Sequence, residues 1–284
     1  MNPSLVLVLY ESQRIDTVLQ IMARLHKQVG FASTVVVRNS PRIDQTALES
    51  RLRAWPGSIE IRDHDNTGME FGAYQAGWAQ LSTASRQGVL YVNDTIGTNQ
   101  YISRFYRARL AGLLTTAPTA SAFACGHVIL HPHRLAIGDL ESASFIRSNL
   151  FFLNQQAMQA LDEQIYRPDI DQLVRVTTDE SRFFAPEVGS GLARHLRNWL
   201  FNTHHTSGWY KAQALNESNA GFMASKARSI LQEKLLSLRL YHQDVVVQPI
   251  DLYGWRQCLH HYAERRWEQK QASQKTRPSQ QDSR

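Results

Sequence analysis

The stretch "LVLVLYES", residues 5–12, decides the fold class of this chain. Its first six residues, Leu5 to Tyr10, are apolar without a break, whereas a strand with one solvated face alternates apolar and polar residues. Such a run predicts a strand that is buried on both faces, as in a parallel sheet covered by helices. The polar residues Glu11 and Ser12 follow directly, so they are expected at the end of this strand.

Strand-like and helix-like segments alternate through roughly the first 110 residues. After the first strand, the pattern predicts strands at 34–37, 58–61 and 88–92, and helices at 15–27, at 46–54 and within 63–81. This order predicts an α/β fold with a mostly parallel, doubly wound sheet flanked by helices. The carboxyl ends of such strands meet at one edge, which is where binding sites lie in folds of this class.

The alternation ends after Gly112, and the later elements are less regular. The expected elements are a mixed run over 120–130, a loop at 131–133, strands at 145–153 and 245–250, and helices at 155–164, 187–201 and 220–241. No repeat or low-complexity linker divides them. We therefore expect one continuous domain over residues 1–263, with a helical C-terminal portion.

Charge and cysteine content narrow the class of protein. The net charge is +6, and residues 264–284 carry half of it, with six Lys or Arg against three Asp or Glu. Their polar composition predicts a disordered basic tail with a weak attraction for anionic lipid headgroups. The two cysteines, Cys125 and Cys258, are expected to be buried and reduced, which indicates a cytoplasmic location. No apolar stretch is long enough to span a bilayer.

Short polar side chains follow each of the first four predicted strands. They include Asn39 after the second strand, Asn66 after the third and Asp94 after the fourth. Each residue taken alone is more typical of a helix cap or a turn. Because all of them stand at strand ends, we expect them to converge on one rim of the sheet and to form a binding site there.

The segment "DHDNTGMEFGAYQAGWAQL", residues 63–81, combines two helix faces. One face is an apolar stripe that is expected to enter the core: Phe71, Tyr74, Trp78 and Leu81. The other holds only small residues: Gly68, Gly72, Ala76 and Ala79. With Asn66 as the expected cap, the start of this helix would present backbone N–H groups to an anion. For this helix alone, packing of the small face against a neighbouring strand is an equally good interpretation, but the polar strand ends on either side of it favour the anion site.

Several of these motifs resemble a known family. "YES", "VVVRNS", "NTGMEFGAYQAGW" and "VLYVND" are similar, in this order, to landmarks of the nucleotide-sugar-dependent glycosyltransferases with the GT-A fold, family 2 in particular. "NDT", "FIRSNLFFLNQQAM" and "PEVGSGLARHL" resemble the rhamnan synthesis F type of transferase. The resemblance covers residues 5–165 well and thins after Pro186. It implies a GT-A-like domain with a nucleotide-binding half over about 1–115 and an acceptor-side half over about 116–263.

The resemblance also implies roles for individual residues. The residues expected to bind the donor are Tyr10, Glu11, Asn39, Asn66, Gly68, Gly72 and Asn93. Ser148 and Asn149 match a polar pair on the acceptor side. A sugar diphosphate fits the small-residue face and the start of the third helix, because this end of a helix attracts anions.

Asp94 and Glu187 are the two catalytic candidates. The family commonly shows Asp-x-Asp or Asp-Asp where this chain has Asn93-Asp94, so Asp94 is expected to hold Mg²⁺ or Mn²⁺ as a single carboxylate. Arg38, Arg104 or Arg107 would then share the diphosphate charge. Glu187 is the implied base for the acceptor hydroxyl, with Asp139 and Glu141 as rivals.

These expectations combine into one hypothesis with alternatives. The chain is predicted to be a hexosyl- or deoxyhexosyltransferase that passes a sugar from a nucleotide donor to a surface polysaccharide or a lipid-linked glycan. It is expected in the cytoplasm, with peripheral contact to the inner face of the membrane through its basic tail. A nucleic-acid-binding protein and a non-catalytic scaffold of a polysaccharide-assembly complex are the alternatives. A dinucleotide-dependent oxidoreductase is disfavoured, because no Gly-x-Gly-x-x-Gly follows an early strand.

Overall fold

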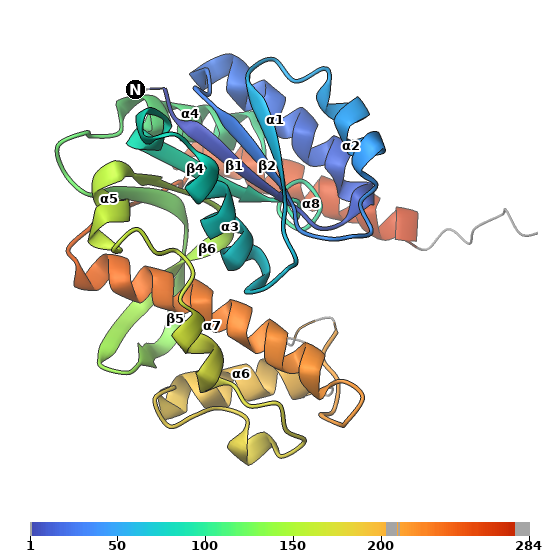
Figure 1. Ribbon diagram of the computed structural model, residues 1–284, viewed down its shortest axis with the longest axis vertical. Coiled ribbons are helices and arrows are strands. Elements are labelled where there is room, and N and C mark those ends of the chain that lie inside the picture. The colour runs from blue at the N-terminus through green and yellow to red at the C-terminus, as the bar shows by residue number, and fades with distance from the viewer. Residues whose placement is uncertain (1, 203–208, 210, 276–284) are drawn as a thin grey trace, which may run out of the picture.

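A seven-stranded sheet organises the residues that the computed structural model describes, which are 2–202, 209 and 211–275 (Figure 1). The strand order is β3-β2-β1-β4-β6-β5-β7. The strands are β1 Ser4–Leu9, β2 Thr34–Arg38, β3 Ile59–Asp63, β4 Gly88–Asn93, β5 Phe123–Ile137, β6 Leu140–Asn154 and β7 Val246–Pro249. β1, β2, β3 and β4 pair in parallel, β6 is antiparallel to both of its neighbours, and β7 is parallel to β5. The predicted class, a mostly parallel sheet flanked by helices, is confirmed.

The central position of β1 explains its unbroken apolar sequence. Leu5, Leu7 and Leu9 belong to a core cluster with α1 Ile15–Val29, α2 Gln45–Leu52 and α4 Arg104–Thr116. Val6 and Val8 belong to a second cluster with α3 Met69–Gln80 and α5 Gln155–Ala160. Because both faces of β1 are covered, no side chain of the strand is more than 2% exposed.

The predicted helix after β3 exists, with its apolar stripe in the core but a different start. Phe71, Tyr74, Trp78 and Leu81 are buried. α3 begins after Gly68, which has a φ of +68°, so the expected cap at Asn66 is wrong. The Asn66 side chain instead accepts a hydrogen bond from Asn39.

The small residues of α3 serve packing within the chain. A Cβ on Gly77 would lie 2.4 Å from a methyl group of Val6, so this glycine allows α3 to approach β1 closely. A Cβ on Gly72 would lie 1.9 Å from the carbonyl oxygen of Thr67, and one on Gly68 would lie 2.6 Å from the ring of Tyr166. The space beside Gly68 and Gly72 of the predicted small-residue face is therefore filled by the chain itself, whereas Ala79 of that face is exposed.

β5 and β6 form a long hairpin that the sequence did not predict. The turn contains Gly138 in the left-handed region, with a φ of +56°. The expected loop at 131–133 lies inside β5, where the register shifts between Leu130 and Leu135. The outer part of the hairpin packs against α6 Ser190–Phe201 and α7 Ala220–His242 around a third apolar cluster, which forms the lower lobe in Figure 1.

The C-terminal region corrects two expectations. Residues 264–275, predicted to be a disordered tail, belong to helix α8 Trp255–Lys275, while 276–284 lie outside the described residues. The contacts of His260 and Trp267 with the region of α4 supply the packing that composition did not reveal. Cys125 is buried as expected, but Cys258 on α8 is exposed. Across the described residues, the helices lack the length and apolar character needed to cross a bilayer.

Candidate functional site

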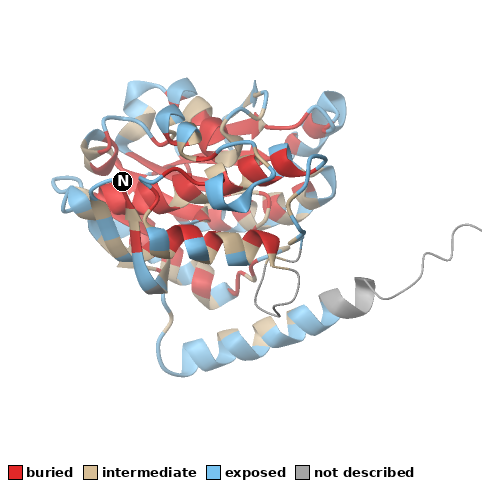
Figure 2. Cartoon of the chain, turned by 90° about the horizontal axis from the view of Figure 1, so that it is seen from below, coloured by how far each residue is buried: buried red, intermediate tan, exposed pale blue. Residues whose placement is uncertain are grey.

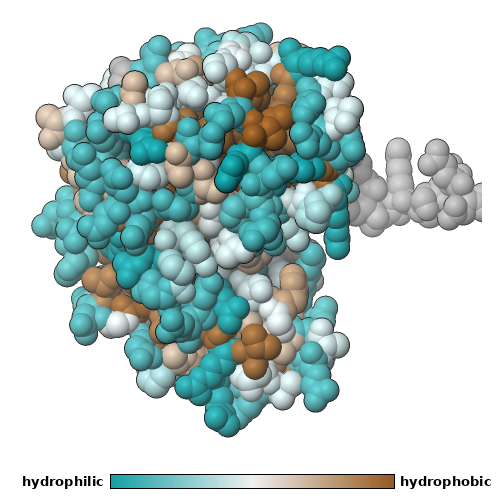
Figure 3. Space-filling view, viewed as in Figure 1, coloured by the Kyte–Doolittle hydropathy of each residue, from teal (hydrophilic) through white to brown (hydrophobic). Residues whose placement is uncertain are grey.

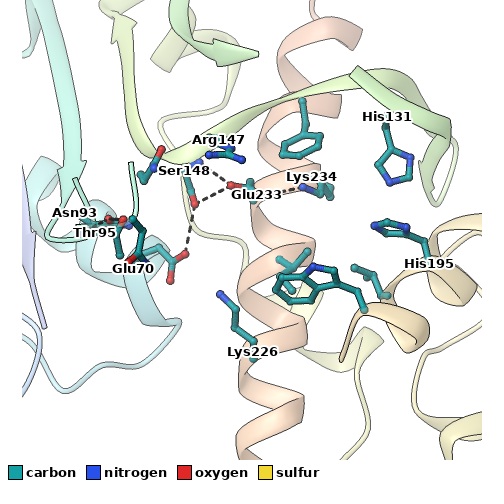
Figure 4. Close-up of a pocket in the computed structure, with 16 residues that line it drawn as sticks. Glu70, Asn93, Thr95, His131, Arg147, Ser148, His195, Lys226, Glu233 and Lys234 are labelled. Atoms are coloured by element: carbon teal, nitrogen blue, oxygen red, sulfur yellow. Dashed lines mark hydrogen bonds and ion pairs between the residues drawn. The ribbon is translucent and has the colours of Figure 1, made fainter. Parts of the chain in front are cut away.

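Two adjoining pockets lie at the carboxyl edge of the parallel strands. The smaller pocket, of about 170 Å³, is lined by residues that follow β1, β2, β3 and β4. The larger one, of about 390 Å³, lies between this edge, β6, α6 and α7 (Figure 4). Both are lined by Glu70, Asn93, Thr95 and Lys226, which therefore mark their common boundary. We call them the sheet-edge pocket and the lobe pocket.

The predicted strand-end residues do converge. Tyr10, Asn39, Asn66, Asn93 and Asp94 all line the sheet-edge pocket, although they come from four different loops. The side chain of Asn39 joins the loop after β2 to the loop after β3. Its Nδ2 donates a hydrogen bond of 2.9 Å to the Asn66 side chain, and its Oδ1 lies 2.7 Å from the His64 ring nitrogen Nδ1. This edge is therefore cross-linked by polar side chains.

Asp94 is held by the backbone of the first strand end. Its Oδ2 accepts hydrogen bonds from the N–H groups of Tyr10, over 2.7 Å, and of Glu11, over 2.6 Å. Its Oδ1 lies 3.7 Å from the Arg14 guanidinium. The residue is only 2% exposed, and burial raises the pKa of this carboxyl while the two N–H donors and Arg14 oppose the rise. Asp94 thus fastens β4 to the loop after β1.

The surroundings of Asp94 do not fit a divalent cation. One carboxylate oxygen is taken by two backbone donors, and the other faces a positive charge. Magnesium and manganese sites need several oxygen ligands, and the described residues contain no group of three or more His, Cys, Asp or Glu side chains that could hold a metal. The cations at this pocket are the side chains of Arg14 and Lys226.

A network of two carboxylates and a serine forms one wall of the lobe pocket (Figure 4). Glu233 accepts from the backbone N–H of Ser148 over 2.7 Å and from its hydroxyl over 3.0 Å, and it forms an ion pair of 2.8 Å with Lys234. Glu70 accepts from the hydroxyl of Ser229 over 2.8 Å and lies 3.5 Å from that of Ser148. Although burial acts to raise it, the pKa of Glu233 is lowered by Lys234 and by these hydrogen bonds, so this carboxylate is ionised at neutral pH.

The opposite wall is basic and aromatic. His131 of β5 and His195 of α6 meet edge to face, with ring centroids 4.5 Å apart, and burial lowers the pKa of both. Arg147, Lys226 and Trp199 also line this pocket, and Arg147 lies beside Ser148 and Glu233 (Figure 4). Lys226 lines both pockets, so its charge faces the space where they meet. Within the described residues, no carboxylate forms an ion pair with it. The pocket can accept an anionic or hydroxyl-rich ligand.

Some predicted site residues lie elsewhere. Ser148 and Asn149 line the lobe pocket, whereas Glu11 contributes its backbone N–H to Asp94. Glu187 is exposed and lines neither pocket. It also precedes the first turn of α6, because this helix begins only at Ser190. The rivals Asp139 and Glu141 stand at the β5–β6 turn, with Glu141 paired to Arg134. Of the predicted cations, Arg38 is paired with Asp63, and neither Arg104 nor Arg107 lines these pockets.

The sequence interpretation missed several groups at the site, including Arg14, Glu70, Lys226 and the Glu233–Lys234 pair, and also Arg147 and His195. Glu233 and Lys234 had a detectable signal, because two adjacent charges interrupt the apolar run of a long helix, "ILQEKLLSL". Charges in such a place are rarely buried unless they are paired. Glu70 and Lys226 carry no such signal, since charged residues in helices are ordinarily solvated.

Comparison with known proteins reveals remote similarity only. No family model matches the chain, and no curated protein matches it. Among solved structures, it resembles S. aureus TarS 1-349 (13% identity, TM-score 0.40, 60% of this chain and 51% of that chain). It also resembles HddC from Yersinia pseudotuberculosis (10%, 0.34, 57% and 80%) and mouse xyloside xylosyltransferase 1 (11%, 0.35, 93% and 92%).

The chain thus spans about half the length of the TarS structure it resembles. With TM-scores below 0.5, these similarities do not define an activity.

Proposed function

We propose that this protein is a glycosyltransferase that moves a sugar from a nucleotide-sugar donor to a hydroxyl of a glycan acceptor. The observation that carries the proposal is the shared boundary of the two pockets, where a carboxylate and a lysine, Glu70 and Lys226, face both spaces. A transfer between two substrates needs adjoining sites with a base and a cation where the reacting atoms meet. Following the sequence resemblance, we take the acceptor to be a surface polysaccharide or its lipid-linked precursor.

The sheet-edge pocket suits the donor. Its polar lining lies at the carboxyl ends of parallel strands, the position that binds nucleotides in open α/β sheets. Arg14 and Lys226 would neutralise the pyrophosphate and stabilise the nucleoside diphosphate as it leaves. The Asp94 carboxylate is already engaged by two backbone N–H groups and by Arg14. We therefore propose that the negative charge of the diphosphate is neutralised without a metal held by Asp94.

Glu70 is the base that this geometry favours. The Ser229 hydroxyl holds its Oε1 at the boundary between the pockets. In the transfer, an acceptor hydroxyl in the lobe pocket bonds to the sugar carbon and gives its proton to Glu70. The bond between the sugar and the phosphate breaks, and the diphosphate leaves with the electron pair.

A binding experiment tests this proposal. Thermal shifts are measured for the wild type, for Lys226→Met and for the matched control Lys27→Met, an exposed lysine of α1, with a panel of nucleotide sugars and nucleoside diphosphates. We expect stabilisation by at least one nucleotide, with or without Mn²⁺, and an affinity roughly tenfold weaker in Lys226→Met only. Stabilisation by none of the ligands, or equal stabilisation of Lys226→Met, contradicts the proposal.

A non-catalytic scaffold is the second candidate. It is favoured by the engagement of the Asp94 carboxylate with the chain's own backbone. A scaffold would bind glycan or partner proteins without releasing a nucleoside diphosphate, so turnover separates the two functions.

A further inference from the structure

Exposed large apolar side chains concentrate in one short segment. Among the described residues, nine such side chains are exposed, and four of them lie within residues 253–262. They are Tyr253, Trp255, Leu259 and Tyr262, which are 68%, 62%, 45% and 56% exposed. By contrast, the face of the molecule in Figure 3 is mostly hydrophilic, with apolar side chains in small separate groups. A concentration of this kind indicates a contact surface.

Three of these side chains form a stripe on helix α8, and Tyr253 lies just before its first residue. Trp255, Leu259 and Tyr262 follow one another at steps of four and three residues, so they lie on one face of the helix. On another face, His260 lies 2.9 Å from the Ser103 hydroxyl, and Trp267 lies against the ring of Tyr101. α8 is therefore fixed to the domain along one side, and its stripe is mostly exposed, as Figure 2 shows. At the start of the stripe, the Trp255 ring also meets the Phe105 ring of α4 edge to face, with centroids 5.4 Å apart.

The stripe of α8 continues with basic residues, and the acidic residues of the helix lie off it. Arg266 and Lys270 continue the stripe at steps of four residues, and the Arg266 guanidinium lies 5.9 Å from the centre of the Tyr262 ring. The acidic residues Glu264 and Glu268 follow His260 at the same steps and so lie off the stripe, and Glu264 lies 3.9 Å from the His260 ring nitrogen Nε2. The open face thus combines aromatic rings with positive charge, without a carboxylate in its line.

We propose that the open face of α8, formed by Trp255, Leu259, Tyr262, Arg266 and Lys270, binds the surface of a bilayer that contains anionic lipids. Aromatic rings with a polar group prefer the boundary between headgroups and acyl chains, and basic residues are attracted by anionic headgroups. The 21-residue helix carries too many polar residues to cross the bilayer, so it lies in the plane of the interface. This binding depends on α8 alone and not on glycosyl transfer.

A bound α8 would also place the lobe pocket near the bilayer. Tyr101 and Ser103, which contact α8, are one and three residues after Gln100, whose side chain accepts a hydrogen bond of 2.6 Å from Asn149 of the lobe pocket. A lipid-linked acceptor would reach the pocket over a short distance. This consequence, unlike the membrane binding itself, rests on the proposed function.

Vesicle flotation of the full chain tests the membrane proposal. Vesicles of phosphatidylcholine alone are compared with vesicles that also contain phosphatidylglycerol, at low and high salt. We expect binding to the anionic vesicles that weakens at high salt. Arg266→Gln with Lys270→Gln should bind about 25-fold more weakly, which is about fivefold for each basic residue.

Replacing the apolar stripe separates burial from charge. Trp255→Ser, Leu259→Ser and Tyr262→Ser together should reduce binding to the anionic vesicles more than tenfold. The matched control replaces three other exposed apolar residues, Leu130, Val176 and Val246, by serine and should bind as the wild type does. Circular dichroism and thermal melting show that each variant is folded.

Three outcomes would overturn the proposal. The first is equal vesicle binding by the stripe variant and the wild type. The second is a wild type that does not bind vesicles but dimerises through the stripe, which would make this face an interface between two copies of the chain. The third is binding of single-stranded nucleic acid through the same residues without vesicle binding.

Discussion

Replacing Asp94 by alanine should destabilise the fold far more than replacing it by asparagine. In Asp94→Ala, the backbone N–H groups of Tyr10 and Glu11 lose their buried acceptor. Each unsatisfied donor costs about 1–3 kcal/mol, so the free energy of unfolding should fall by about 2–6 kcal/mol. In Asp94→Asn, one amide oxygen can accept from both donors, since both now bond to the same atom, and the loss should be about 1 kcal/mol.

Urea unfolding followed by circular dichroism measures both changes. The pH dependence of the stability difference between the wild type and Asp94→Asn also has a predicted direction. Because burial raises the pKa of Asp94, its ionisation opposes folding, so the wild type should lose stability relative to Asp94→Asn as the pH rises from below the ordinary value of 3.8 through the folded pKa. Equal stabilities of Asp94→Ala and the wild type would refute a structural role for this carboxylate.

Further predictions concern packing and the buried ion pair. Gly77→Ala should destabilise the protein by about 1–2 kcal/mol, because its Cβ would overlap Val6. Gly112→Ala in α4 should stabilise it by about 0.5–1 kcal/mol, because nothing lies within 4 Å of the added Cβ. Thermal melting of both variants checks that the two changes in stability have opposite signs. Lys234→Met should cost about 3 kcal/mol, and adding Glu233→Gln should restore part of the loss. The lowered pKa of Glu233 means that its contribution is present above the ordinary value of 4.5 and is lost as the pH falls through the folded pKa. The penalty of Lys234→Met in urea titrations should therefore shrink in acid, and a constant penalty would contradict the pairing.

The parallel half of the fold could be predicted because its physical signals are local. A strand buried on both faces must be apolar throughout, as "LVLVLY" is, and polar residues at strand ends must converge wherever the strands are parallel. Asn39, Asn66 and Asp94 meet for this reason. Their pairings could not be predicted, because whether Asp94 faces a ligand or a backbone N–H depends on the conformation of the loop that follows β1.

The other half depends on contacts between distant segments. Glu187 was assigned by the family resemblance and by its place at an expected helix start, but α6 begins later and the residue faces solvent. Glu70 and Lys226 are 156 positions apart and line the same pockets only because α7 packs against α3, so no local pattern joins them. Helix α8 was missed because its composition is that of a solvated segment, while its packing side has only a few residues, His260 and Trp267 among them.

The most direct test of the central claim is the release of nucleoside diphosphate from a panel of nucleotide sugars, with a glycan acceptor, by the wild type and two single variants. If Glu70 at the boundary of the two pockets accepts the proton of the acceptor, Glu70→Gln should lower the rate at least about 100-fold while nucleotide binding is retained. Glu187→Gln, which removes an exposed carboxylate outside both pockets, should leave the rate unchanged. Full activity of Glu70→Gln, or loss of activity in Glu187→Gln alone, would contradict the account.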